Sequence, residues 1–226
     1  MKWCIAIICN NEKNIPWMSV SMDFLKRAFE YSGITAEFVS NLTYNVRDVH
    51  PSWYKLLIHK HLEYKYDYCL CWDVDLLPTH KHSVLDIQAE IESNKFYACR
   101  DTGTLYSDSY FVEIPQISSH FRWNCGLFGI PKSQSAAMEY LYQTNHNSTK
   151  PSYEQYHIAE YLYHHKDYVI DGNPCNNVLV QAVSTSNLNH VLHFGTSNCL
   201  HYSISDPNIR GAMILEHCSW KDRIYR

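Results

Sequence analysis

Two apolar runs most constrain the fold of this chain. Residues 3–9 (WCIAIIC) are continuously apolar, and residues 66–78 (YDYCLCWDVDLLP) are apolar at their centre and closed by Pro78. Uninterrupted apolar runs of this length are typical of strands that are buried on both faces of a parallel sheet. We therefore expect two such strands, the second of them a central strand that ends near Asp73.

The segments beside these runs have helical spacing. Residues 17–31 carry apolar side chains every three or four positions and are followed by Gly33, a typical helix stop. Residues 52–65 repeat the pattern, with Ser52 as the candidate N-cap, and a short strand fits residues 34–39. The alternation of strand and helix predicts an α/β fold with a mostly parallel central sheet flanked by helices.

The pattern is less regular in the rest of the chain. Further helices and strands are expected at residues 86–93, 96–99, 125–130, 132 into the 140s, 153–164 and 191–194. Residues 100–122 have few periodic signals and are expected to form a loop over the site. The chain has 226 residues, 46% of them hydrophobic, and contains no low-complexity linker. We therefore expect one domain that spans residues 1–226.

Charge and apolar length argue against two classes of partner. The formal net charge of −4 argues against broad nucleic-acid binding, which needs a basic face. No apolar segment is long enough to span a membrane, and the run at residues 3–9 is too short for a signal-peptide core. The 9 cysteines include no CxxC pair, which favours reduced thiols. These features predict a cytoplasmic protein without a membrane span.

Asp73 and Asp75 form the most informative pair in the sequence. In an extended segment, residues two apart point to the same face, and two carboxylates about 6 Å apart repel by about 3 kcal/mol at an effective dielectric near 20. A divalent cation that prefers oxygen ligands, Mg²⁺ or Mn²⁺, offsets this repulsion most simply. Ligands of open α/β sheets also bind at the carboxyl ends of strands. The alternative is that both aspartates are solvated loop residues.

Three elements of the sequence resemble those of one enzyme class. Residues 71–78 (CWDVDLLP), an apolar strand followed by DxD, resemble the hallmark of GT-A-fold nucleotide-sugar glycosyltransferases. Residues 123–128 (WNCGLF) are similar to the N-x-G-aliphatic-aromatic segment of the glycogenin-like branch. Residues 193–195 (HFG) resemble the H-x-G element that holds a third metal ligand in that branch. The order and approximate spacing of these elements fit over residues 1–200.

The resemblance implies a metal-dependent transfer of a sugar from a UDP- or GDP-sugar to a hydroxyl of a glycan or glycoprotein. Asp75 would bind Mn²⁺ or Mg²⁺, Asp73 would bind the metal or the ribose of the donor, and His193 would complete the metal shell. The branch usually continues H-x-G-x-x-K-P-W, whereas this chain reads HFGTSN up to Asn198. The lysine that faces the phosphates is therefore missing after His193, and His201 is the alternative third ligand.

The resemblance also implies a set of donor contacts. Asn124 would hydrogen-bond the donor sugar, and Gly126 would let the backbone approach it closely. Asn10 and Asn11 follow the first strand, where such folds receive the nucleotide base. Lys55, on the helix before the DxD strand, is a candidate for nucleotide contacts.

Sugar transfer also needs a group that manages the acceptor hydroxyl. Residues 151–156 (PSYEQY) resemble the acidic element that supplies this group, with Glu154 as the first candidate and Asp171 as the second. Asn124 and Glu154 would together orient donor and acceptor. An acid in the first turn of a helix is also favoured by the helix dipole alone, and the sequence does not distinguish inversion from retention.

Two other functions fit parts of the sequence. A phosphatase of the haloacid dehalogenase type also has DxD after an apolar strand, but its second aspartate is normally followed within two residues by Thr or Val in a glycine-containing turn. Here Asp75 is followed by Leu76, Leu77 and Pro78. A non-catalytic carbohydrate-binding domain is the other alternative. The 7 glycines and the lack of secretory features would fit a viral or bacterial enzyme.

Overall fold

The computed structural model describes residues 1–9, 15–40, 49–100, 123–148, 154–180, 197–204, 206–221 and 225. Its main sheet has the strand order β2-β1-β3-β6-β5-β7. These strands are β1 Trp3–Cys9, β2 Ala36–Ser40, β3 Tyr68–Asp73, β5 Phe96–Arg100, β6 Trp123–Pro131 and β7 Val169–Gly172. β1 pairs in parallel with β2 and β3, and β5 pairs in parallel with β7. β6 is antiparallel to β3 and β5, so the sheet is mostly parallel, as predicted.

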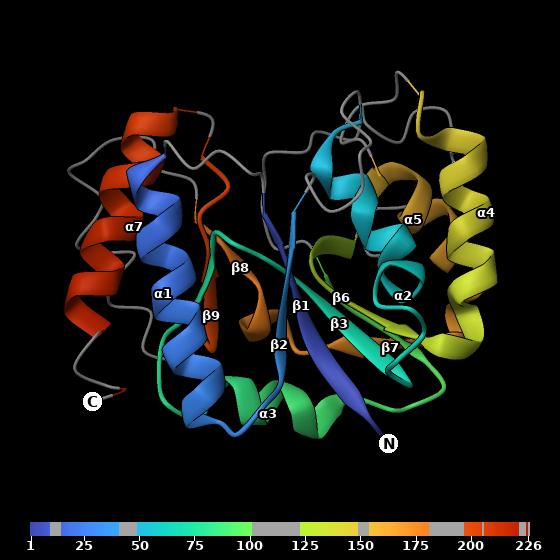
Figure 1. The fold of residues 1–226 in the computed structure, drawn as a ribbon, viewed down its shortest axis with the longest axis horizontal. Coiled ribbons are helices and arrows are strands. Elements are labelled where there is room, and N and C mark those ends of the chain that lie inside the picture. The colour runs from blue at the N-terminus through green and yellow to red at the C-terminus, as the bar shows by residue number, and fades with distance from the viewer. Residues whose placement is uncertain are drawn as a thin grey trace.

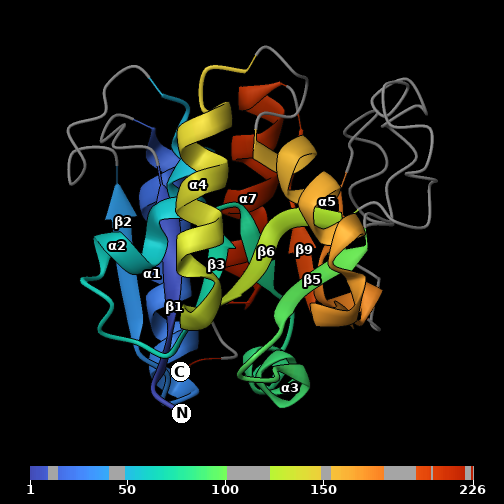
Figure 2. The same ribbon diagram turned by 90° about the vertical axis from the view of Figure 1, so that its right-hand side faces the viewer.

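Helices cover both faces of this sheet (Figures 1 and 2). α1 and α7 lie side by side on one face, and α2, α4 and α5 lie on the other. The α-helices are α1 Pro16–Tyr31, α2 Ile58–His61, α3 Ser83–Glu90, α4 Ser135–Asn145, α5 Glu154–His164 and α7 Pro207–Lys221. The 3₁₀ turns are η2 Pro51–Leu57, η5 Lys132–Gln134, η6 Lys166–Tyr168 and η7 Pro174–Asn176.

The first apolar run is buried on both faces, as its sequence predicts. Ile5 and Ile7 pack in the core that includes α1 and α7, whereas Cys4, Ala6 and Ile8 pack in the core that includes α4 and α5. All five side chains are buried. Alternate residues of a strand point to opposite faces, so β1 contributes to both cores.

A second, smaller sheet extends the first core. It has the order β4-β9-β8, with β4 Leu76–Pro78, β8 Val178–Leu179 and β9 Cys199–His201. β4 pairs antiparallel with β9, so that Leu76 is opposite His201. This pairing brings the C-terminal part of the chain to the end of β3.

The strand predicted in the second apolar run ends at Asp73, as expected, and the last three residues of the run form a separate short strand, β4. A turn at Val74 and Asp75 separates β3 from β4. The Val74 carbonyl accepts a hydrogen bond from the Ser21 hydroxyl of α1, and Trp72 Nε1 donates to the Leu76 carbonyl at 2.7 Å. These side-chain contacts stabilise the turn, and periodicity within the run does not reveal them.

The helix predicted at residues 52–65 is also shorter and less regular than expected. Pro51 begins it as a 3₁₀ turn, and the N-cap is His50 instead of Ser52. α2 ends at His61, and Glu63 and Tyr64 then have φ values of 50° and 54°. Residues in the left-handed region end a helix, so residues 62–65 are not helical.

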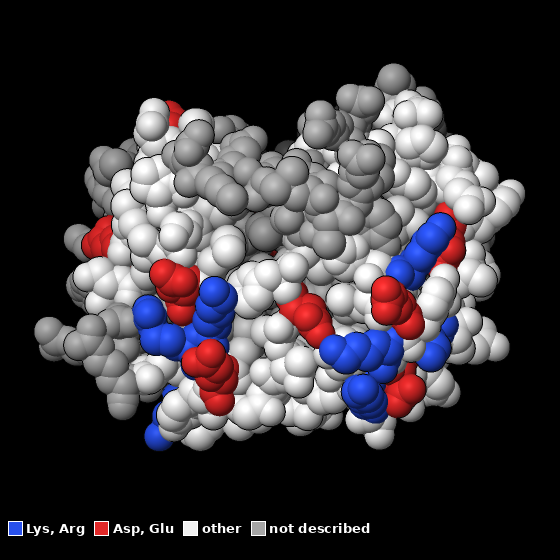
Figure 3. All heavy atoms as spheres, in the orientation of Figure 1, with Lys and Arg blue, Asp and Glu red and all other residues white. Residues whose placement is uncertain are grey.

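The remaining elements agree in type with the predictions and differ in their bounds by a few residues. The strand predicted at residues 191–194 lies outside the described residues, as does most of the loop predicted at 100–122. Within the described ranges, no helix is both long and apolar enough to cross a membrane. The face seen in Figure 3 carries acidic and basic side chains mixed together.

Gly129 of β6 lies between two tyrosines, so this position tests how tightly the sheet is packed. A Cβ at Gly129 would overlap the hydroxyl of Tyr68 and lie 2.8 Å from the Cβ of Tyr97. We expect Gly129→Ala to lower the free energy of unfolding by about 1–3 kcal/mol, measured by urea denaturation. The Tyr68 hydroxyl is buried and has no hydrogen-bond partner in the described part of the chain. Tyr68→Phe should therefore restore part of the loss, and strictly additive effects would contradict this packing.

Candidate active site

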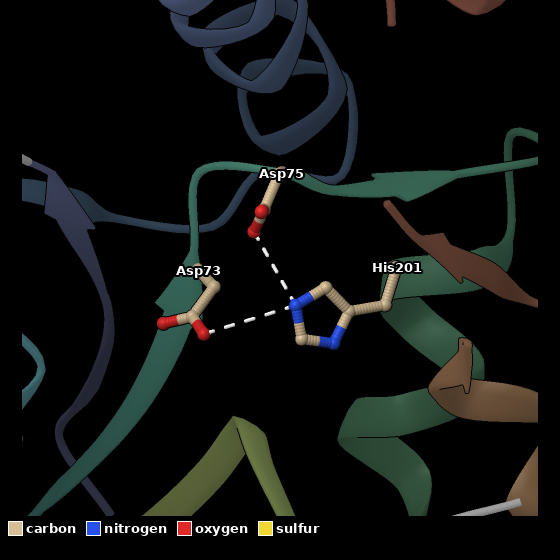
Figure 4. Close-up of side chains that lie close together, drawn as sticks. All are labelled: Asp73, Asp75 and His201. Atoms are coloured by element: carbon tan, nitrogen blue, oxygen red, sulfur yellow. Dashed lines mark ion pairs between the residues drawn. The ribbon is translucent and has the colours of Figure 1, made fainter. Parts of the chain in front are cut away.

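Three side chains that can bind a metal converge where β3 ends (Figure 4). Asp73 is the last residue of β3, Asp75 follows in the turn, and His201 ends β9. His201 Nε2 lies 3.3 Å from Asp75 Oδ1 and 3.9 Å from Asp73 Oδ2. One ligand atom from each residue lies within 4.8 Å of the other two. Carboxylate oxygens suit Mg²⁺ and Mn²⁺ and imidazole suits transition metals, so this donor set fits a divalent cation.

Backbone hydrogen bonds hold the histidine against the acidic turn. Tyr202 N donates to the Asp75 carbonyl at 2.9 Å, directly after the Leu76–His201 pair of the small sheet. The Trp72 indole fixes the other side of the turn through the Leu76 carbonyl. Backbone pairing therefore places β9 beside the turn, and the Trp72 side chain stabilises the turn itself.

Lys55 lies buried beside Asp73. Its Nζ is 2.8 Å from Asp73 Oδ1 and 3.3 Å from Glu154 Oε1, and it donates to the Cys125 carbonyl at 2.7 Å. The side chain is 2% exposed. An ammonium group has three donors, and here three protein oxygens surround it. Burial lowers the pKa of Lys55, but the charges of Asp73 and Glu154 outweigh burial and raise it.

The two aspartates have opposite pKa shifts. Burial raises the pKa of Asp73, and the nearby Lys55 offsets only part of this. Burial also acts on Asp75, but His201 and Arg210 outweigh it and lower the pKa. For His201, burial lowers the pKa and Asp75 outweighs it, so the result is raised. Asp75 therefore loses its proton at lower pH than Asp73 does.

A β-bulge in β6 lies beside the site, because Gly126 is close to the His201 ring. Cys99 is paired with Asn124 while Ala98 is paired with Phe128, so residues 125–127 have no partner on β5. The Cys125 N–H donates instead to the Gln155 side chain at 3.2 Å. Bulges of this kind commonly lie next to active sites, where they redirect the chain.

The structure brings most of the predicted site residues that it describes around one point. They are Lys55, Asp73, Asp75, Asn124, Gly126 and Glu154. Asp171 does not join them, because it is exposed on β7 at the edge of the main sheet. Asn10, Asn11 and His193 lie outside the described residues.

His201, the alternative third ligand of the sequence analysis, completes the group among the described residues. A spacing in the sequence supports it. Pro207 follows His201 by six residues, which is the His-to-Pro spacing of H-x-G-x-x-K-P. Ser203 then stands in place of the glycine and Asp206 in place of the lysine.

Two further residues at the site were not predicted from the sequence. Arg210 of α7 has its Nη1 3.7 Å from Asp75 Oδ2, and Asn177 contacts both Asn124 and His201. When His201 is matched to the histidine of H-x-G-x-x-K-P, Asp206 takes the place of the lysine, and Arg210 lies four residues after it. No sequence motif marks Asn177.

The sheet order, the helices on its two faces and the acidic turn at the end of β3 define the GT-A fold. The sequence matches no family model and no curated protein, so the fold comparison comes from solved structures.

A glycosyltransferase involved in glycosylation of the major capsid of PBCV-1 has 13% identity and a TM-score of 0.69, covering 94% of this chain and 99% of its own. The galactosyltransferase LgtC, in complex with donor and acceptor sugar analogues, has 12% identity and a TM-score of 0.61, with coverages of 96% and 95%. Mouse xyloside xylosyltransferase 1 has 12% identity and a TM-score of 0.55, with coverages of 90% and 98%. At these identities the likeness establishes the fold.

The buried charge of Lys55 can be tested by removing it. Lys55→Met leaves Asp73 and Glu154 without their shared cation, so we expect the free energy of unfolding to fall by about 3–5 kcal/mol. Lys65→Met is the matched control, because Lys65 pairs with Glu37 at the surface at 3.3 Å and exposed pairs contribute little. Urea denaturation of both variants gives the comparison, and equal losses would contradict the assigned role of Lys55.

Gly126 tests whether His201 needs the space beside the bulge. A Cβ at Gly126 would overlap His201 Cε1 and lie 2.6 Å from its Nδ1. Gly126→Ala should displace the imidazole. If the three side chains bind Mn²⁺, the ion raises the melting temperature by mass action, and we expect a smaller rise in Gly126→Ala than in the wild type. Gly33→Ala is the control, because a Cβ there meets nothing within 4 Å, although its φ of 68° adds strain. An unchanged Mn²⁺ shift in Gly126→Ala would contradict the prediction.

Proposed function

We propose that this protein is a glycosyltransferase that moves a sugar from a UDP- or GDP-sugar to a hydroxyl of a glycan or glycoprotein and depends on Mn²⁺ or Mg²⁺. The observation that carries the proposal is the group of Asp73, Asp75 and His201 at the carboxyl end of β3 in a GT-A fold. Ligands of α/β sheets bind at this edge. The three solved structures described above are glycosyltransferases, which supports the same class of reaction here.

Asp73, Asp75 and His201 would hold the cation. When bound, it would act as a Lewis acid that neutralises the charge on the diphosphate as it leaves the sugar. His201 and Pro207 have the same spacing as the His and Pro of the H-x-G-x-x-K-P element. This agreement also supports membership of the glycogenin-like branch.

Arg210 is proposed to supply the positive charge that the missing lysine supplies in that branch. Its guanidinium is held in place because Nε donates to the Ile204 carbonyl at 2.8 Å, and the side chain is 31% exposed. An arginine fork suits phosphate oxygens. Arg210 would therefore contact the diphosphate beside Asp75.

Asn124 and Glu154 are proposed to orient donor and acceptor. Asn124 Oδ1 already accepts two hydrogen bonds, from Gly126 N and Asn177 Nδ2, so its contact to the sugar would use Nδ2. Of the two candidate acids, we favour Glu154, because it adjoins Asp73 through Lys55. The buried ammonium would hold the Glu154 carboxylate in place.

The decisive experiment is a screen of nucleotide-sugars for hydrolysis and transfer, with and without Mn²⁺. We expect turnover with one UDP- or GDP-sugar that requires the cation. Asp75→Asn keeps the volume of the side chain and removes its charge, and we expect it to lower kcat by at least about 100-fold. Asp86→Asn, an exposed acid on α3, should leave kcat unchanged.

Other outcomes would replace the proposal. Release of phosphate from simple monoesters, with nucleotide-sugars untouched, would indicate the phosphatase alternative. Binding of a sugar or nucleotide-sugar, seen as a higher melting temperature without any turnover, would indicate a carbohydrate-binding domain. Full activity of Asp75→Asn would exclude the proposed metal site.

A further inference from the structure

A chain of hydrogen bonds leads from the β6 bulge to the histidine of the metal group. Gly126 N donates to Asn124 Oδ1 at 2.8 Å. A backbone N–H can only donate, so the oxygen of the Asn124 amide must face it. The backbone therefore fixes which way the Asn124 side chain is turned.

Asn177 transmits this orientation to His201. Its Nδ2 lies 2.9 Å from Asn124 Oδ1, and because Asn124 presents an oxygen, Asn177 must present its NH₂ group. Asn177 Oδ1 then lies on the other side, 3.1 Å from His201 Nδ1. An amide oxygen only accepts, so Nδ1 of the histidine carries the proton.

The consequence concerns the opposite nitrogen of the ring. A neutral imidazole has one N–H, so a proton on Nδ1 leaves a lone pair on Nε2. Nε2 is the atom that faces Asp75 at 3.3 Å and Asp73 at 3.9 Å. A metal ligand needs this lone pair, and the hydrogen bond on the other ring nitrogen decides where it lies.

Backbone hydrogen bonds also hold the segment that carries Asn177 in place. Asn177 is fully buried and immediately precedes β8, which pairs with β9 through Val178 and Leu200. Val180 N donates to the His201 carbonyl at 2.8 Å. The residue that orients the imidazole is therefore tied to the strand that carries it.

We propose that Asn177 is a positioning residue that fixes His201 in the Nδ1–H form and so directs the Nε2 lone pair at the cation held by Asp73 and Asp75. This rests on the proposed metal-dependent function. Asn177 is not one of the three residues proposed to hold the cation, and it would act on the cation through its contact with His201. Orienting partners of this kind typically affect metal affinity by about 10–100-fold when they are removed.

The first test needs no metal and leaves Asn177 unchanged. Nitrogen-15 NMR of the metal-free protein reports which ring nitrogen carries the proton once the ring is neutral. Because Asp75 raises the pKa of His201, the spectra are followed upward in pH until the ring has lost its second proton. The His201 signals are assigned as those lost in His201→Gln. We expect the Nδ1–H tautomer, and an Nε2–H tautomer would overturn the proposal.

The second test measures the dissociation constant of Mn²⁺ alone by electron paramagnetic resonance. Asn177→Leu keeps the volume of the side chain but removes the acceptor, so we expect His201 to lose its tautomer preference and the constant to rise about 10–100-fold. Asn177→Asp keeps an acceptor for Nδ1–H but places an oxygen against Asn124 Oδ1. It should therefore keep the tautomer and most of the affinity for Mn²⁺ while it lowers the melting temperature.

The pair of variants separates positioning from a merely structural role. If affinity for Mn²⁺ follows the melting temperature rather than the tautomer, or if Asn177→Leu binds Mn²⁺ as the wild type does, the proposal is wrong. If Asn177→Leu does not fold, the wild-type tautomer and the Asn177→Asp variant still decide the question. A wild-type protein with the Nδ1–H tautomer that binds neither Mn²⁺ nor Mg²⁺ would instead overturn the metal-dependent function.

Discussion

The buried ammonium of Lys55 is the contact on which the arrangement of the site depends. It joins η2, the end of β3, the bulge of β6 and the start of α5, because Asp73, Cys125 and Glu154 all meet at its Nζ. Bringing these acids together without a cation would be costly in a medium of low dielectric constant. The buried Lys55 ammonium therefore pairs with the carboxylates of Asp73 and Glu154. The Asp75 carboxylate does not contact Lys55 and faces His201 and Arg210 instead.

The pattern of residues within short segments was sufficient to predict the strands of the main sheet and the importance of Asp73 and Asp75. The run at residues 3–9 has one structural solution, since a strand with no polar face must be covered on both sides, and α1 and α5 belong to the two layers that cover it. Asp73 and Asp75 could be recognised because an apolar strand that ends in two acids is chemically unusual. In both cases the information lies within about ten consecutive residues.

The parts that could not be predicted are those that distant residues determine. β4, β8 and β9 contain two or three residues each, too few for any periodicity, and they exist because they pair with one another. His201 could be named from the sequence as an alternative ligand, but no local pattern encodes the pairing of β4 with β9 that brings it to the site. Asn177 is harder still, because its role depends on which way an amide is turned, and that is set by the backbone N–H of Gly126.

The long separation of the small sheet's partners has a consequence for synthesis of the chain. Thr79, which follows β4, bonds to Asn198, 119 residues later. At ribosomal rates of about 5–20 residues per second, residues 76–79 are synthesised roughly 6–24 s before the segment that pairs with them. During this delay its backbone offers an open edge to other nascent chains, and Pro78, which lacks an N–H, shortens the edge that such a chain could pair with.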